Sequence, residues 1–280
     1  MVQWCCMQLT HNNLFEQHIW DYYDAYGRHD LPWRCADAAG IFDPYRIVVS
    51  EVMLQQTQVQ RVIPKFEMFI AAYPDFAALA AAPLADVLIL WNGLGYNRRA
   101  KFLWQLAGEV MAKHDGILPR DNQALVRLPG IGPNTAGAIL AYAFNKPVTF
   151  IETNIRTVFI HHFFADQTVV ADALLEPLIA DTVPRDHSRE WYWALMDYGT
   201  HLKQTVGNAS RASKAYIRQS TFAGSRRQIR GQVLKMLTKG SATLDELHAH
   251  IVDERLESVV QDLTQEGFIM QIGTAYQLSA

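Results

Sequence analysis

The stretch Leu128-Pro-Gly-Ile-Gly-Pro-Asn-Thr-Ala136 decides the fold that we predict for this chain of 280 residues. Its two glycines stand one residue apart and let the backbone turn sharply between two helical segments. The N–H groups at the start of the second helix then point outward, where a phosphate can bind with help from the helix dipole. Because Leu-Pro precedes the turn and Thr-Ala follows it, the stretch predicts a helix–hairpin–helix rather than an ordinary connection. The candidate phosphate-binding residues are Gly130, Ile131, Gly132, Asn134 and Thr135.

Helical patterns dominate the chain from residue 10 to about 222. Apolar residues recur there at helical spacing, and Pro and Gly residues separate the segments. No alternating strand pattern precedes residue 240, so the fold class is mainly α. We predict helices over 44–70, 84–91, 98–114, 135–144, 154–164, 174–180 and 188–195.

A different unit begins at Gly224-Ser225. One helical face is followed by a capping box at Thr243–Glu246, a helix over 244–251 and another over 254–266. The segments 268–272 and 275–278, joined by Gly273-Thr274, indicate a β-hairpin. Three helices and two strands predict a small winged helix over 225–280.

The third helix of this unit is acidic, with four acids against the single Arg255. Such a helix would oppose binding to phosphates. We therefore favour a packing or protein-contact role for the unit over DNA reading, and a protein partner is possible. The four acids are Glu254, Glu257, Asp262 and Glu266.

The composition is typical of a globular protein: 50% of the residues are hydrophobic, with seven Trp and eleven Tyr. The three cysteines, Cys5, Cys6 and Cys35, include no CxxC pair, which argues against a disulfide framework, a zinc site or an iron–sulfur cluster. The N-terminus lacks the pattern of a secretory signal, and Pro83 and Asp86 interrupt the most apolar stretch. We expect a cytoplasmic protein with no membrane segment and no metal.

The charge is unevenly distributed, although the net charge is only −3. No acid lies between Asp197 and Asp245, whereas nine of the 25 Lys and Arg residues do. One interpretation is a solvated, Ser-rich linker. The other is a surface that follows phosphates, for which the candidates are Lys203, Arg211, Lys214 and Arg218.

Glu152 is the first candidate catalytic acid. Thr153 or Asn154 can cap the helix that follows, which places Glu152 just outside a helix N-terminus. The dipole favours an ionised carboxylate there, and such a group can stabilise a developing sugar cation. The alternative is an acid that only complements the dipole.

Glu51 is the second candidate. It lies among valines and methionine in Val48-Val-Ser-Glu-Val-Met-Leu-Gln-Gln-Thr57, so we expect it to be largely buried. Burial favours the neutral acid, which can protonate a leaving nitrogen near neutral pH. The nearby amides of Gln55 and Gln56 suit the edges of bases. The alternative is a buried acid bonded to a structural arginine.

Together these motifs resemble the endonuclease III superfamily of helix–hairpin–helix DNA glycosylases, and most closely its adenine DNA glycosylases. The similarity runs from Leu31-Pro-Trp-Arg34 to Gly199. Its most specific stretches are Ser50–Val59, Leu90-Trp-Asn-Gly-Leu-Gly-Tyr96, Leu128–Gly132, Thr135–Ile139 and Ala194-Leu-Met-Asp-Tyr-Gly199.

The resemblance implies two helical lobes, one over about 43–146 and one formed by 10–42 and 147–222, with a flipped base bound between them. Glu51 corresponds to the general acid, and Glu152 to the acid that stabilises the sugar cation and directs water. The implied partner is double-stranded DNA with a mispaired or damaged base, bound by a monomer associated with the nucleoid. The implied base pocket comprises Arg34, Gln55, Gln56, Asn154 and Trp193.

The chain departs from the resembled family at several positions. Glu152 stands where the family has Asp, and Asn134 stands where a bifunctional enzyme has its Schiff-base lysine, so we expect no lyase step. The four cluster cysteines fall in frame on Lys203, Ser210, Ser213 and Gln219, so we expect no iron–sulfur cluster; a monovalent cation at the hairpin is possible. Trp193 and Asn97 replace residues typical of the adenine branch.

We therefore predict a monofunctional DNA glycosylase that removes adenine opposite 8-oxoguanine or guanine. Removal of mispaired thymine or uracil is one alternative, because Trp193 need not suit adenine. A non-catalytic binder of mispaired or damaged DNA is the other, because of the longer acid at Glu152.

Overall fold

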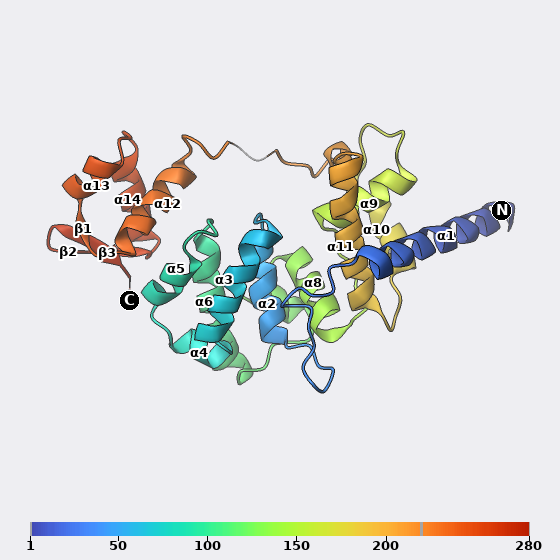
Figure 1. Ribbon diagram of the computed structural model, residues 1–280, viewed down its shortest axis with the longest axis horizontal. Coiled ribbons are helices and arrows are strands. Elements are labelled where there is room, and N and C mark those ends of the chain that lie inside the picture. Colours follow the sequence, from blue (N-terminus) through green and yellow to red (C-terminus); the bar gives the residue numbers. More distant parts are fainter. Residues whose placement is uncertain (1, 219–220, 280) are drawn as a thin grey trace. The chain divides into compact units, whose positions relative to one another are not determined.

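The computed structural model describes residues 2–218 and 221–279, with side chains from residue 13 onward. The fold is mainly helical, as predicted (Figure 1). Helices α5 (Leu84–Trp91) and α6 (Arg98–His114) begin and end at the predicted residues. Helix α11 (Ser188–Thr205) continues past the predicted end at residue 195, because Leu195, Tyr198 and Leu202 keep its inner face buried.

The remaining helices agree with the predicted segments to within a few residues wherever a segment was predicted. They are α1 (Val2–Tyr26), α2 (Pro44–Leu54), α3 (Val59–Ala72), α4 (Phe76–Ala81), α7 (Asn122–Arg127), α8 (Pro133–Phe144), α9 (Thr153–Phe163), α10 (Asp172–Thr182), the 3-10 helix η1 (Ala209–Ala212), α12 (Arg226–Leu237), α13 (Leu244–His250) and α14 (Leu256–Gln265).

The chain forms two compact units. Unit 1 comprises Met1–Ile47, Arg120–Val126 and Ile131–Arg218. Within it, α11 packs against α1, α8 and α9, and η1 packs against α9. Its core contains the fully buried side chains of Trp191, Tyr192 and Phe159.

Helix α8 belongs to unit 1 because of a close approach at Gly137. A Cβ atom at this position would lie 2.6 Å from Cβ of Phe150, so only glycine lets α8 pack there. Our lobe limits, 43–146 for one lobe and 10–42 with 147–222 for the other, remain predictions.

Unit 2 comprises Val48–Pro119, Arg127–Gly130 and Gln219–Ala280. Helix α6 packs against α4 and α5, and α3 packs against α5. The fully buried side chains of Phe66, Phe69, Trp91 and Leu103 form the core of these helices.

The C-terminal module, residues 225–280, contains the predicted helices and hairpin and one strand that we did not predict. Strands β2 (Ile269–Ile272) and β3 (Ala275–Leu278) pair antiparallel, and β1 (Ala242–Thr243) joins the other edge of β3. Strand β1 has only two residues, which are too few to show an alternating pattern in the sequence. The capping box is confirmed, because Thr243 N donates to the Glu246 carboxylate at 2.7 Å. The classification of the module as a winged helix stays a prediction.

In the part of the chain that the structure describes, no helix is both long and apolar enough to cross a membrane.

Candidate active site

The turn between α7 and α8 has the backbone of a tight hairpin. Gly130 has a φ of +77°, and a Cβ atom there would lie 2.8 Å from Cβ of Phe102, so glycine is required on both grounds. Gly132 caps α8, and Pro133 occupies its first position, where no N–H is needed. Gly130 and Gly132 are exposed, whereas the Ile131 side chain is buried. The hairpin therefore offers backbone groups to a ligand, and Ile131 anchors it.

Asn134 connects the start of α8 to the segment before α9. Its side chain is exposed, and its Oδ1 accepts a hydrogen bond from Ile151 N at 3.4 Å. Ile151 directly precedes Glu152, so the start of α8 and the candidate acid are tied together within unit 1. Thr135 is half-buried in the first turn of α8.

Glu152 is itself the N-cap of α9, so our prediction of Thr153 or Asn154 as the cap was wrong. The backbone of Glu152 is extended, and its carbonyl accepts the first helical hydrogen bond from Arg156 N at 2.8 Å. Its carboxylate accepts from Asn154 N at 3.5 Å, a long bond for a cap. Asp is a preferred N-cap because its shorter side chain reaches this amide. The half-exposed carboxylate of Glu152 lies at the positive end of the α9 dipole.

Lys203 lies behind this carboxylate. Gly199, one turn earlier in α11, lets the two helices touch, since a Cβ there would lie 2.5 Å from Asn154 O. Lys203 Nζ then donates to Asn154 Oδ1 at 2.7 Å. Burial lowers the pKa of Lys203, the charge of Glu152 opposes this shift, and that of Arg156 adds to it. The half-buried ammonium that we assigned to phosphate thus has a side-chain partner in unit 1, and its phosphate role stays a prediction.

Glu51 lies in the last turn of α2 and is half-buried, not largely buried as we expected. The helix turns about 100° per residue, so the buried Val48, Val49 and Val52 face the core while Glu51 lies at the border of that face. Gln55 and Gln56 follow the helix; Gln55 is half-buried and Gln56 exposed.

Arg99 is a residue that our sequence analysis missed. It lies in the first turn of α6, and its guanidinium donates to Val52 O and Met53 O, both at 2.8 Å, at the end of α2. The signal was present in the sequence: an arginine occupies a position on the apolar face of α6 with Leu103 and Leu106.

Arg34 and Trp193, predicted for the base pocket, lie in the core of unit 1. Arg34 donates to both carboxylate oxygens of Asp197, at 2.8 and 2.9 Å, and Arg28 binds the same carboxylate. Burial opposes ionisation of Asp197, but these arginines outweigh it and keep the pKa of Asp197 below its usual value. Trp193 is 6% exposed and stacks on Tyr142. Their pocket roles stay predictions.

The loop after α11 carries the other predicted phosphate contacts. Arg211, Lys214 and Arg218 are exposed, and a hollow of about 380 Å³ is lined by Arg211, Tyr216 and Arg218. Unlike Lys203, these side chains are placed to meet a ligand from solvent.

The second half of the basic stretch instead packs within unit 2. Arg226 pairs with Asp262 at 2.7 Å, Arg230 pairs with Glu266 at 2.8 Å, and Arg227 donates to the hydroxyl of Tyr96. These three arginines therefore hold the C-terminal module together and join it to the start of α6.

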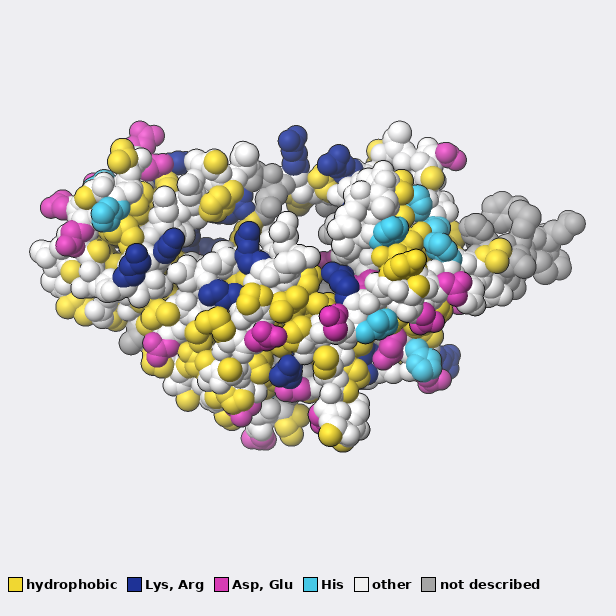
Figure 2. Space-filling view, in the orientation of Figure 1, with side chains coloured by type: hydrophobic (Ala, Val, Ile, Leu, Met, Phe, Trp, Pro, Cys, Tyr) yellow, Lys and Arg dark blue, Asp and Glu magenta, His cyan; other side chains and the backbone are white. Residues whose placement is uncertain are grey.

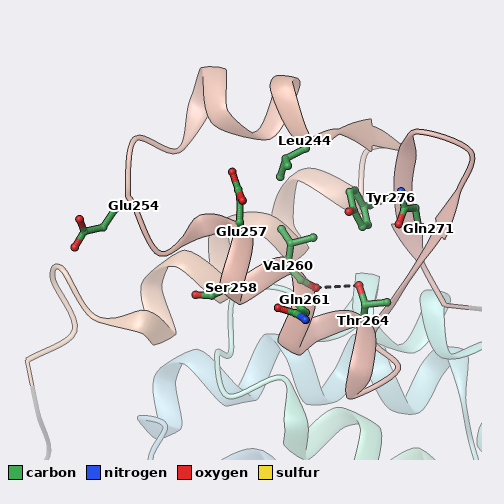
Figure 3. A pocket seen from close by; sticks show the side chains of 9 residues that line it. All are labelled: Leu244, Glu254, Glu257, Ser258, Val260, Gln261, Thr264, Gln271 and Tyr276. Atoms are coloured by element: carbon green, nitrogen blue, oxygen red, sulfur yellow. Dashed lines mark hydrogen bonds between the residues drawn. The ribbon is translucent and has the colours of Figure 1, made fainter.

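Two of the four acids around α14 are neutralised by these pairs, and the other two lie at a groove. Glu254 and Glu257 are exposed, and acidic side chains stand out at the edge of the module (Figure 2). The groove has a volume of about 600 Å³ and runs between α14, Leu244 and the β3 residue Tyr276 (Figure 3). The rim of this groove is acidic, and our expectation of a packing or protein-contact role for the unit stays a prediction.

The chain was compared with known proteins. A profile of the HhH-GPD superfamily of base excision DNA repair proteins matches residues 49–178. The chain is 31% identical over 266 residues to the adenine DNA glycosylase of Mycolicibacterium smegmatis (strain ATCC 700084 / mc(2)155), covering 86% of this chain and 89% of that protein. The chain belongs to the HhH-GPD superfamily.

One of the similar curated proteins is considerably longer than this chain. The adenine DNA glycosylase of Buchnera aphidicola subsp. Baizongia pistaciae is 37% identical over 216 residues, which cover 75% of this chain and 60% of that protein. The chain thus spans less than two thirds of this relative. Among solved structures, a thermostable thymine-DNA glycosylase has a TM-score of 0.59 at 25% identity, covering 69% of this chain and 87% of that one. An endonuclease III from a DNA complex shares the fold, with a TM-score of 0.53 at 19% identity over 68% of this chain and 83% of that one.

The loop in which the resembled family has its cluster cysteines does not fit an iron–sulfur cluster here, because such a cluster needs thiolate ligands. Ser210 is buried and donates to Asn208 Oδ1 at 2.6 Å. Ser213 is buried and donates to Asp172 at 3.3 Å. Gln219 lies outside the described residues. Within the described part of the chain, no group of three or more His, Cys, Asp or Glu side chains is arranged to hold a metal.

Proposed function

We propose that this chain is a DNA glycosylase of base excision repair that hydrolyses the N-glycosidic bond of adenine mispaired with 8-oxoguanine or guanine. The observation that carries the proposal is Glu152, an acid at the N-terminus of the helix that follows a helix–hairpin–helix. An ionised carboxylate there stabilises a developing sugar cation and directs water onto it. The adenine DNA glycosylases to which the chain is similar support adenine as the base.

The proposed reaction is a single displacement. The adenine is flipped out of the duplex and read by the amides of Gln55 and Gln56. Glu51 donates its proton to the purine as the bond between C1′ and nitrogen breaks. Glu152 stabilises the cation and accepts the proton of the water that bonds to C1′, so the products are free adenine and an abasic site. Asn134 offers no amine for a lyase step.

The proposed partner is double-stranded DNA, bound through phosphates. The hairpin amides supply one anchor, with or without a monovalent cation, and Arg211, Lys214 and Arg218 supply another. We propose that the enzyme works as a monomer in the cytoplasm, associated with the nucleoid, without an iron–sulfur cluster. The hydrogen bonds of Ser210 and Ser213 support a cluster-free loop.

A second candidate is removal of thymine or uracil mispaired with guanine. The similarity to a thymine-DNA glycosylase supports it, because the chain covers 87% of that protein. The bulky Trp193, where the adenine branch has a smaller polar side chain, points the same way.

Four duplexes test both candidates. The full chain is incubated with DNA containing A:8-oxoguanine, A:G, T:G or U:G, and abasic sites are then cleaved with alkali. We expect scission of the adenine strand in the first two duplexes and no scission before alkali. Scission of T:G or U:G alone would establish the second candidate. Tight binding without scission of any duplex would make the protein a mispair binder and reject both.

A further inference from the structure

Within the part of the chain that the structure describes, Arg99 is buried and has no acidic partner among its hydrogen bonds. The residue is 8% exposed, and its guanidinium donates to five acceptors, of which none is a carboxylate. Burial lowers its pKa to about 10. Burying an arginine whose hydrogen-bond acceptors are all uncharged is costly, so the contacts that Arg99 makes must offset this cost.

The five acceptors belong to three segments that are separate in the sequence. Nη1 binds the carbonyls of Val52 and Met53, which are among those left without helical partners at the end of α2. Nη2 binds Thr57 Oγ1 at 3.0 Å. It also binds Leu94 O at 3.3 Å and Gly95 O at 3.1 Å. One planar side chain therefore joins the end of α2, the turn after it and the turn before α6.

Both turns contain a strained residue. Gln56 has a φ of +55° and Tyr96 a φ of +48°, a backbone conformation that side chains other than glycine seldom adopt. Such strain persists only where surrounding contacts enforce it, and it gathers at ligand-binding sites. The Arg99 guanidinium supplies contacts on both turns and lies over the Tyr96 ring, 5.5 Å from its centroid. Thr57 Oγ1 also lies 3.4 Å from Leu94 O, which adds a direct link between them.

We propose that Arg99 is a positioning residue, which holds the Gln55–Thr57 turn and the Leu94–Tyr96 turn as one rigid element next to Glu51 and so sets the rate and base preference of the reaction. The inference rests on the proposed function. Gln56 is exposed and Gln55 half-buried, and Glu51 stands one residue before the first carbonyl that Arg99 binds. Lysine cannot replace Arg99 in this role, because its ammonium lacks a planar fork that spans five acceptors.

The test compares Arg99→Lys with Arg98→Lys, the same change at the exposed neighbour. The single-turnover excision rate is measured on the duplex that the parent cleaves best and on one other, together with binding of a fully paired duplex and the melting temperature. We expect Arg99→Lys to lose about 100-fold in rate and much of its base preference, with binding within about threefold of the parent, because small misplacements in an active site have this effect. Arg98→Lys should match the parent.

A purely structural role would have a different signature. It would lower the melting temperature while leaving the rate per folded molecule and the base preference as in the parent, and that result would overturn the inference. If Arg99→Lys does not fold, the excision rate of the Thr57→Val variant is measured in its place. It should lose about tenfold in rate, and a parent-like rate would overturn the inference. An inactive parent would reject the proposed function and this inference with it, whereas an active parent with an equally active Arg99→Lys would reject the inference alone.

Discussion

Glu152 stands at the N-terminus of α9, whereas Glu51 lies in the last turn of α2, close to the C-terminus of that helix. The N-terminus of a helix carries the positive end of its dipole and the C-terminus the negative end, so the two carboxylates lie at dipole ends of opposite sign. Glycoside hydrolysis needs one carboxylate that is ionised and one that is protonated. The two helix ends therefore suit the roles that we assign, Glu152 to the sugar cation and Glu51 to the base.

The N-terminus of α9 and the C-terminus of α2 also differ in how a cationic side chain supports them. Lys203 reaches Asn154 from another helix, through a single side-chain contact at 2.7 Å. Arg99 binds mainly backbone carbonyls and spans three segments. The first arrangement depends on the identity of two side chains and on Gly199, whereas the second would tolerate changes of most residues whose carbonyls it binds.

The largest effect is expected at the α2 end. Glu51→Gln should lower the single-turnover rate of adenine excision by about 10⁴-fold, since the amide cannot protonate the leaving base. Binding to the mispaired duplex should change little. Glu67→Gln, an exposed acid on α3, is the control and should leave the rate unchanged. A Glu51→Gln enzyme with more than a tenth of the parent rate would remove Glu51 from the mechanism.

At the α9 end, Glu152→Gln should lower the rate by about 10³-fold, the effect of removing one group that stabilises charge in the transition state. Glu152→Asp should remain active and gain about 0.5 kcal/mol in the free energy of unfolding, because Asp is a preferred N-cap. Rates and urea unfolding measure the two effects. Full activity of Glu152→Gln would contradict the proposed mechanism.

The two ends differ in how far the sequence predicted them. Gln55 and Gln56 were proposed because they lie in the same contiguous motif as Glu51, and the hairpin was also predicted from one contiguous stretch. The contact of Lys203 with Asn154 joins residues far apart in the chain, so charge alone led us to assign Lys203 to phosphate. The partners of Arg99 were missed because four of its five acceptors are backbone carbonyls, which the sequence does not reveal; only its place on the apolar face of α6 was a signal. The first and last residues of the helices were easier to predict from the sequence, since the periodicity of apolar residues is a local pattern.

Lys203→Met tests which role this ammonium has. Without the cation behind Glu152, we expect the single-turnover rate to fall about tenfold, roughly one pKa unit of interaction energy. The slope of log K against log salt for DNA binding should not change if the half-buried Lys203 serves Asn154 rather than phosphate. Arg211→Gln should reduce that slope by about 0.9, the value for one lost phosphate contact. A slope that falls in Lys203→Met would return Lys203 to the phosphate surface.

The smallest effect that we expect is on the free energy of unfolding, and it concerns the loop that packs beside α9. Hydrogen bonds from Arg156 hold the pKa of Asp172 below its usual value, and Asp172 also accepts from Ser213. Because the folded-state pKa is the lower one, this pair contributes stability above the unfolded pKa of about 3.9, and that stability is lost as the pH falls through the folded value.

Asp172→Asn should therefore lower the free energy of unfolding at pH 7 by less than about 1 kcal/mol, because the carboxylate is partly exposed to solvent. The difference from the parent should shrink below pH 4, where the parent has lost the same interaction. Urea unfolding at both pH values measures it, with the exposed Asp166→Asn as the control. If the difference is the same at pH 7 and below pH 4, the pair is not what stabilises the loop, and its link to α9 lies in the hydrogen bond from Thr157 Oγ1 to Asn208 Oδ1 instead.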